Sequence, residues 1–186
     1  MSVCRSFWDI SSVRSDLAYD GSYPVNRRHF DAFIGGLKVR TLGGWLKRLR
    51  IDLSGDAVCE VGFGGGHTLR YLSDTAAYAC GIDVITECLT HAQALGVSAD
   101  RLFDGANLPP ELPQRIDFWL FQDNFEHIPQ PAQFVEWVER NSSANTEVLV
   151  VLPEAASISA ARQEAQGGRF RDEARYPRRP QLQSFV

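Results

Sequence analysis

The chain has 186 residues, of which 44% are hydrophobic and 23% charged, and its net charge is -4 at pH 7. This length suits one domain with a substantial core rather than two. The acidic balance argues against nucleic acid as an obligatory partner, because phosphate binding normally needs a basic surplus. No apolar run approaches the roughly 20 residues of a membrane span, and no secretory apolar segment follows Met1. We therefore expect a reduced, cytoplasmic protein without a membrane span.

Residues 1–54 are expected to form an N-terminal helical cap. From Asn26, taken as the N-cap, the pattern predicts a helix, a glycine break and a second, amphipathic helix. The apolar side chains of that second helix follow i, i+3, i+4, i+7 spacing: Leu42, Trp45, Leu46 and Leu49. This region is predicted to act as a lid.

Strands and helices alternate over residues 55–152, the expected core domain. We expect strands at 57–61, 77–83, 101–105, 116–121 and 146–152, and helices at 67–74, 85–95 and 131–141. Apolar runs without alternation favour strands that are covered on both faces. The repetition predicts a doubly wound, mostly parallel α/β sheet with helices on both sides. Residues 153–186 form an arginine-rich, proline-broken segment, expected to be partly irregular.

The stretch VCEVGFGGGHTL, residues 58–69, places a glycine loop directly after the first strand of this core. Ligands of open α/β sheets bind at the carboxyl ends of the strands. A P-loop is excluded because the loop has no lysine, and a dinucleotide fingerprint would need glycine where His67 stands. Glu60 would repel a pyrophosphate in a partly desolvated site, whereas it suits a cationic ligand.

The pattern E-x-G-x-G-x-G at 60–66 resembles the first motif of the class I S-adenosylmethionine-dependent methyltransferases, which have a Rossmann-like fold. In that family the glycine loop passes under the amino-acid part of the cofactor. The acid contacts the positive end of the cofactor, directly or through water. The resemblance implies that S-adenosylmethionine is bound by Glu60 and by the loop residues Gly62, Phe63, Gly64 and Gly66.

Two further strand ends extend the resemblance. Asp83 ends the second strand, where this family and the nicotinamide enzymes alike place an acid on the ribose hydroxyls, and Val84 beside it could pack on the adenine. The segment LFDGANLP, residues 102–109, resembles the part of the family that meets the adenine edge. There Asp104 is favoured over the backbone near Gly105 and Ala106.

The segment 116–138 resembles the fourth-strand region of the family, in which an E-H-I/L/V pattern precedes a proline and a helix. The resemblance, which covers about residues 55–152, implies that Gln122 and Asp123 lie over the cofactor. It also implies that Glu126 and His127 face the methyl acceptor. Neutral histidine is well matched to remove a hydroxyl proton near pH 7, so His127 is the candidate general base. The alternatives are that it caps the following loop or packs on the cofactor.

Further aromatic and histidine side chains carry expectations of their own. Trp119, Trp137 and Phe134 are expected in the core. His67 is expected to offer a backbone N–H to the ligand, and His91 to lie on the surface. The predicted lid contains the aromatic residues Trp8, Tyr19 and Tyr23. Two alternatives stay open for them: one of them contacts the cofactor or substrate, or they only pack in the core or on the surface. The acids, cysteines and histidines do not cluster at metal-ligand spacing, so no metal is expected.

We therefore expect an S-adenosylmethionine-dependent methyltransferase that acts on a small-molecule or glycan-type acceptor. The alternatives are a non-catalytic cofactor- or partner-binding module with a truncated methyltransferase fold, and an NAD(P)-dependent oxidoreductase, which Glu60 and His67 disfavour. The resemblance implies a seven-stranded sheet, of which strands six and seven are expected to be missing here. The exposed edge of strand five would then be covered by the tail, by a partner chain or by a homodimer.

Overall fold

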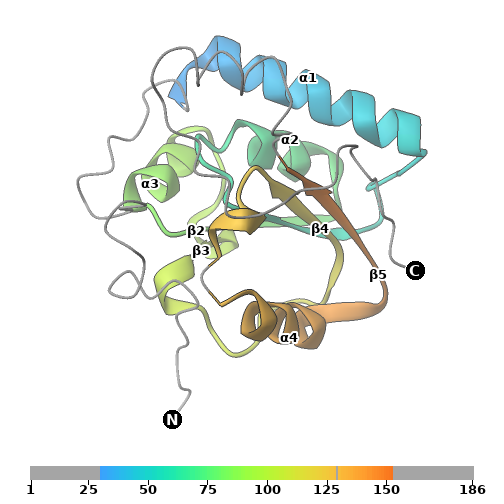
Figure 1. Cartoon of the computed structure of the whole chain (residues 1–186). Coiled ribbons are helices and arrows are strands. Elements are labelled where there is room, and N and C mark those ends of the chain that lie inside the picture. Colours follow the sequence, from blue (N-terminus) through green and yellow to red (C-terminus); the bar gives the residue numbers. More distant parts are fainter. Residues whose placement is uncertain (1–29, 129, 153–186) are drawn as a thin grey trace, which may run out of the picture.

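The computed structural model describes residues 30–128 and 130–152. Its centre is a sheet of five strands in the order β3-β2-β1-β4-β5, in which every neighbouring pair is parallel (Figure 1). The strands are β1 Ala57–Val61, β2 Tyr78–Asp83, β3 Leu102–Asp104, β4 Ile116–Gln122 and β5 Ser142–Val151. The helices are α1 Ala32–Leu49, α2 His67–Thr75, α3 Thr86–Ala94 and α4 Pro131–Asn141, with short 3-10 turns η2 Ala99–Arg101, η3 Gly105–Asn107 and η4 Phe125–His127. The doubly wound α/β fold is confirmed.

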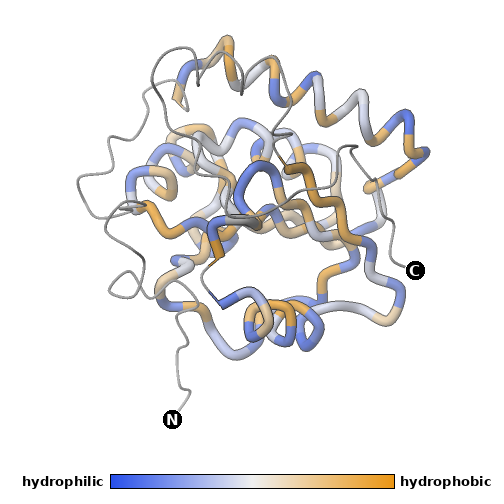
Figure 2. The backbone as a smooth tube through the Cα atoms, viewed as in Figure 1, coloured by the Kyte–Doolittle hydropathy of each residue, from blue (hydrophilic) through white to orange (hydrophobic). Residues whose placement is uncertain are grey.

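Helices cover both faces of the sheet, which explains why the strands carry apolar residues at consecutive positions. On one face, Leu42 of α1 and Leu69 of α2 share a buried cluster with Val58 of β1. On the other face, Phe134 of α4 shares a buried cluster with Cys59, the next residue of β1. Figure 1 shows α1 and α4 on opposite sides of the sheet, and Figure 2 shows hydrophobic and hydrophilic residues alternating along both helices.

The aromatic residues expected in the core lie there. Trp119, Trp137 and Phe134 have no exposed surface. The ring centroids of Trp119 and Trp137 are 6.0 Å apart in an edge-to-face arrangement, which is a favourable geometry for aromatic pairs. This cluster fastens α4 to the sheet.

The start of α1 differs from the prediction. Its N-cap is Asp31, whose Oδ1 accepts a hydrogen bond from the backbone N–H of Ile34 at 2.9 Å. This contact satisfies one of the free amides of the first turn, which is the usual role of an aspartate N-cap. The predicted N-cap, Asn26, lies outside the described residues.

The predicted glycine break in α1 is wrong. The helix runs without interruption through Gly35 and Gly36. A Cβ atom at Gly35 would lie 2.2 Å from the ring of His67, so the missing side chain lets α1 approach the start of α2. The glycine therefore serves close packing rather than helix termination. Leu49, expected on the apolar face, is 37% exposed at the end of the helix.

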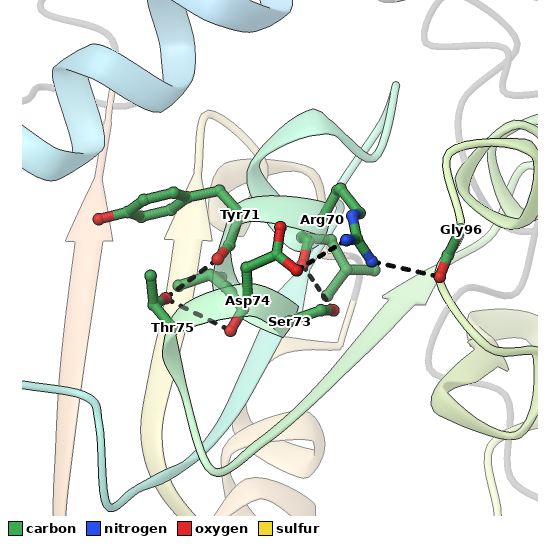
Figure 3. A network of polar contacts seen from close by, with 8 residues as sticks. Arg70, Tyr71, Ser73, Asp74, Thr75 and Gly96 are labelled. Carbon is green, nitrogen blue, oxygen red and sulfur yellow. Dashed lines mark hydrogen bonds and ion pairs between the residues drawn. The ribbon is translucent and has the colours of Figure 1, made fainter.

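A polar network joins α2 to the loop after α3 (Figure 3). Arg70 forms an ion pair with Asp74 one turn later at 2.7 Å, and its other terminal nitrogen donates to the carbonyl oxygen of Gly96 at 3.4 Å. Gly96 itself has φ of 91°, the left-handed conformation that ends a helix. The two helices that follow β1 and β2 are therefore tied together on the outside of the molecule.

Strand β5 begins four residues before its predicted start, at Ser142 instead of residue 146. Polar residues fill this first part, and the register against β4 shifts between Ile116 and Phe118. Ser142 is held by the indole N–H of Trp119 at 2.9 Å, so side-chain contacts extend the strand where the residue types suggest a loop. Residues 153–186 lie outside the described part of the chain, so the expected absence of strands six and seven stays a prediction. Cover of the β5 edge by a homodimer stays a prediction.

The strand order places the topological switch of the sheet between β1 and β4. From β1 the chain moves through β2 to β3, then returns to the opposite side of β1 as β4. Ligands of such sheets bind beyond the carboxyl ends of the strands at this point. Within residues 30–128 and 130–152, no helix has the length and apolar character that crossing a membrane requires.

Candidate functional site

The glycine loop joins β1 to α2 at the switch point. Gly62, Gly64 and Gly66 have φ of 69°, 56° and 76°, a region that residues with a Cβ atom rarely occupy. Packing adds a second requirement, since a Cβ atom at Gly66 would lie 2.8 Å from the Cβ of Ala92 in α3. The loop therefore needs these glycines for its own conformation, and the ligand must be inferred from the polar groups around it.

Glu60 is the most unusual of those groups. Its residue is 2% exposed, near the carboxyl end of β1. Oε1 accepts a hydrogen bond from the hydroxyl of Thr68 at 2.5 Å, whereas Oε2 is buried and has no hydrogen-bond partner among the described residues. Buried polar atoms without partners are rare and call for an explanation such as a ligand.

Burial also changes the protonation of this carboxyl group. Desolvation raises the pKa of Glu60 to about 8, against the smaller lowering effects of the Thr68 hydrogen bond and of Lys38 on α1. In the free protein the group is therefore largely protonated at pH 7. A cation placed at Oε2 would favour the ionised form and supply the missing donor.

Asp83 lies at the end of β2 and is 6% exposed. Its Oδ2 accepts the backbone N–H of Gly64 at 2.8 Å, and its Oδ1 accepts that of Ile85 at 2.9 Å. Burial raises the pKa of Asp83 to about 6, although these backbone hydrogen bonds, and one from Val84, act to lower it. Because each carboxylate oxygen can accept more than one hydrogen bond, the side chain fixes the glycine loop and retains capacity for a diol.

Asp104 ends β3 directly beside Asp83 in the parallel register. Its Oδ1 accepts the backbone N–H of Ala106 at 2.9 Å, and its Oδ2 accepts the side-chain amide of Asn107 at 2.6 Å. The carboxylate thus shapes the turn that carries the buried Gly105. The acid and the turn backbone both lie at the strand end where the adenine edge was expected.

Two predicted contact residues have different environments. The side chain of Phe63 is 4% exposed and packs in the core on the side of α1, α2 and α3. A Cβ atom at Gly81 of β2 would lie 2.6 Å from its ring, so a glycine at 81 makes room for it. Only the backbone of Phe63 is therefore left to meet a ligand. Val84 is half-buried and follows Asp83 at the open end of the sheet.

The end of β4 supplies three consecutive polar residues. Gln122 has a buried Nε2 atom without a partner among the described residues. Asp123 is exposed and has φ of 52°, an uncommon conformation for a residue other than glycine, and its N–H donates to the carbonyl of Val151 at 2.9 Å. Asn124 donates from Nδ2 to the carbonyl oxygen of Val61 at 2.5 Å, and its Oδ1 atom is buried without a partner among the described residues. A positive φ at a residue other than glycine, as at Asp123, is often found at functional sites.

His127 lies at the end of η4, just beyond these residues. It is half-buried, and its backbone N–H donates to the carbonyl of Asn124 at 2.9 Å. The structure therefore places its backbone beside the end of β4, and its role at the acceptor stays a prediction. Pro129 of the E-H-x-P pattern and the lid aromatics Trp8, Tyr19 and Tyr23 lie outside the described residues.

The expectation that His91 is a surface residue is wrong. It is partly buried, and its Nδ1 lies 2.8 Å from the carbonyl oxygen of Gly65, which requires a proton on that nitrogen. Its ring centroid is 5.7 Å from that of His67, whose Nε2 is buried without a partner among the described residues. Burial and the neighbouring His91 lower the pKa of His67. His91 of α3 thus contacts the glycine loop, whereas the ring of His67 lies beside His91 and against Gly35 of α1.

Two residues of this site were missed in the sequence. Thr68 lies in the first turn of α2, eight positions after Glu60, and a hydroxyl at that position was the available signal. Asn124 stands between the predicted residues Gln122 and Glu126, yet its partner Val61 is 63 positions away. That contact depends on the β1–β4 pairing, so the local sequence carried no signal for it.

Residues 59–150 match the family described as "Methyltransferase domain". This span includes the glycine loop and the carboxyl ends of the strands β1, β2, β3 and β4. The resemblance to the class I S-adenosylmethionine-dependent methyltransferases is confirmed for this part of the chain. The methyltransferase match begins one residue before Glu60 and ends within β5, so it covers the whole switch point.

Curated relatives carry the name ubiquinone biosynthesis O-methyltransferase. The protein of that name from Bordetella parapertussis is 32% identical over 97 residues, which are 50% of this chain and 40% of the relative. A protein of the same name from Xylella fastidiosa is 32% identical over 92 residues. The chain thus spans about two fifths of the length of the curated relatives it matches.

A solved structure shares the fold. The plantazolicin methyltransferase BpumL, in complex with a pentazolic desmethylPZN analogue and SAH, superposes with a TM-score of 0.54 at 21% sequence identity. The match covers 72% of this chain and 52% of that protein. This likeness confirms the Rossmann-like methyltransferase architecture of the sheet and its helices.

Proposed function

We propose that this chain binds S-adenosylmethionine at the carboxyl ends of β1, β2 and β3 and transfers its methyl group to a small-molecule acceptor. The proposal rests on Oε2 of Glu60, which lies beside the glycine loop. This atom is buried and has no hydrogen-bond partner among the described residues. An ammonium group is the kind of donor this atom lacks, and it also stabilises the ionised carboxylate. An anionic pyrophosphate at the same place would instead disfavour the ionised form.

The other predicted residues have roles along the same edge of the sheet. The glycine loop, whose conformation depends on Gly62, Gly64 and Gly66, would carry the amino-acid part of the ligand. Asp83 would accept both ribose hydroxyls while holding the N–H of Gly64. The adenine would lie between Val84 and the turn that Asp104 supports. These assignments follow the order of the strands, β1 to β2 to β3.

The acceptor side would lie beyond β4. When bound, the cofactor supplies an electrophilic methyl group on a sulfonium centre. The chain must hold the acceptor atom about 3–3.5 Å from that carbon, in line with the bond that breaks. His127 would take the hydroxyl proton of the acceptor at a ring nitrogen, with Gln122 and Asp123 lying over the cofactor. A neutral imidazole suits this task near pH 7.

The curated relatives are named O-methyltransferases, which supports an oxygen acceptor. We therefore propose a hydroxyl group of a small molecule as the methyl acceptor. A sugar hydroxyl belongs to the same chemistry and is the narrower form of the proposal. Methyl transfer from labelled S-adenosylmethionine to hydroxylated small molecules and to sugar derivatives would separate these two forms.

Isothermal titration tests the cofactor directly. We expect one equivalent of S-adenosylmethionine or S-adenosylhomocysteine to bind and NADH not to bind. Binding of NADH without binding of either adenosyl ligand would overturn the proposal in favour of an oxidoreductase. Binding of the adenosyl ligands without methyl transfer to any acceptor would leave a cofactor-binding module.

A further inference from the structure

We propose that Asn124 is a binding residue for the amino-acid end of the cofactor, offering its Oδ1 to the ammonium group while its Nδ2 fixes the glycine loop. This inference rests on the proposed function and extends it to a residue for which the sequence predicts no role. It makes Asn124 a determinant of specificity for adenosyl ligands that carry an α-amino acid.

The fold brings Asn124 to the glycine loop through the β1–β4 pairing. Val61, the last residue of β1, pairs with Phe121 of β4. The chain then turns back over the strand end, and a Cβ atom at Gly62 would lie only 2.6 Å from Cγ of Asn124. The side chain therefore lies directly on the first glycine of the loop, at the topological switch of the sheet.

The peptide between Val61 and Gly62 is held from both neighbouring strands. Its carbonyl oxygen accepts a hydrogen bond from Nδ2 of Asn124 at 2.5 Å, on the β4 side. Its N–H donates to the carbonyl oxygen of Ile82 at 2.7 Å, on the β2 side. Asn124 thus supplies one half of a clamp that sets the direction in which the glycine loop leaves the sheet.

The same hydrogen bond fixes the orientation of the amide group. A carbonyl oxygen accepts only from a donor, so Nδ2 must face Val61 and Oδ1 must point away from it. Oδ1 is buried and has no hydrogen-bond partner among the described residues. A buried acceptor without a donor is destabilising. If Asn124 served only to clamp the loop, its unpartnered Oδ1 would therefore lower stability without any benefit.

Glu60 presents a second buried acceptor without a partner among the described residues, at the same end of β1. Two acceptors, one ionisable and one neutral, suit an ammonium group, which has three N–H donors. An adenosine ligand without the amino-acid end has nothing to offer either atom. The two acceptor atoms, Glu60 Oε2 and Asn124 Oδ1, should therefore favour ligands that carry the amino-acid end.

The test compares two ligands and two asparagine variants of the full chain. S-Adenosylhomocysteine carries the amino-acid end, whereas 5′-methylthioadenosine has the same adenosine and thioether without it. We expect Asn124→Ala to weaken S-adenosylhomocysteine binding about 10- to 100-fold, and 5′-methylthioadenosine binding less than about 3-fold, as for a lost hydrogen bond to a charged group. Asn141→Ala is the matched control.

Asn141 is also a buried asparagine, but it bonds the N–H of Leu112 and the carbonyl of Trp137 in α4, away from the loop. Its variant should be less stable and should change the two affinities by equal factors. Equal losses for both ligands in Asn124→Ala, or no loss, would overturn the inference. Failure of the parent chain to bind either ligand would instead refute the proposed function, and the inference with it.

A measurement on the parent chain avoids dependence on folding of the variant. In protein labelled with 15N at asparagine, the side-chain amide signals of Asn124 should shift on adding S-adenosylhomocysteine. They should shift much less with 5′-methylthioadenosine at the same saturation. Equal shifts with both ligands would contradict a contact with the amino-acid end.

Discussion

The hydroxyl of Thr68, in the first turn of α2, donates to Oε1 of Glu60 in β1 at 2.5 Å. This contact joins the two ends of the glycine loop through side chains. It occupies one oxygen of the buried carboxyl group and leaves the other, Oε2, for a ligand. The pairing also explains how a buried acid is tolerated, because the hydrogen bond opposes the effect of burial on its pKa.

Replacing Thr68 with valine should raise the pKa of Glu60 further, because the hydrogen bond that lowers it is lost. We expect S-adenosylhomocysteine binding at pH 7 to weaken about 3- to 10-fold, since more energy is then needed to ionise the acid. Titrations over a range of pH would measure the effect. Thr68→Ser keeps the hydroxyl and should bind like the parent chain; equal weakening in both variants would contradict the role of the hydrogen bond.

Cofactor affinity should rise with pH from about 6 to about 8. The pKa of Glu60 is about 8 in the free protein, and the ammonium group of the ligand favours the ionised form. Binding near pH 7 should therefore release close to one proton. Calorimetry in buffers of different ionisation enthalpy measures that number. Asp83, with a pKa of about 6, contributes only at the lower end of this range. An affinity independent of pH would argue against contact with Glu60.

The buried carboxyl group of Glu60 should also reduce the stability of the fold at neutral pH. Its pKa is raised from 4.5, the ordinary value for a glutamate side chain, to about 8 in the fold, so the unfolded chain releases the proton first. The free energy of unfolding should then fall by up to about 1.4 kcal/mol per pH unit between these values. Glu60→Gln removes this loss, so its stability relative to the parent should increase from pH 5 to pH 8 in urea denaturation. A constant difference between the two chains would exclude the buried ionisation.

Two adjacent glycines of α1 should respond in opposite directions. Gly35→Ala places a methyl group against the ring of His67 and should destabilise the protein by about 1–3 kcal/mol. Gly36→Ala meets nothing within 4 Å and should stabilise the helix by about 0.5–1 kcal/mol. Thermal or urea unfolding measures both. Stabilisation by Gly35→Ala would show that α1 does not pack on α2 as described.

The strands were predictable from the sequence because both faces of the sheet are covered. Consecutive apolar residues such as those of β1 and β4 then identify a strand without any need for alternation. The predicted break in α1 failed for the opposite reason. The reason for glycine at position 35 is the ring of His67, which is distant in the sequence. Local propensity alone therefore suggested helix termination.

The site was predictable where the residues follow a strand end. Glu60, Asp83 and Asp104 each lie at or next to the end of their strand, so the strand assignment was enough to bring them to one edge. Asn124 and His91 reach the glycine loop only through tertiary contacts, from β4 and from α3. Their roles depend on strand order and helix packing, which no short motif encodes.

The most direct test of cofactor binding at this site is a crystal structure of the chain with S-adenosylhomocysteine. We expect the amino group within hydrogen-bond distance of Glu60 Oε2 and Asn124 Oδ1, the ribose hydroxyls on Asp83, and the adenine beside Val84 and Asp104. A ligand bound with its amino-acid end away from Glu60, or bound elsewhere than at the carboxyl ends of β1, β2 and β3, would contradict it.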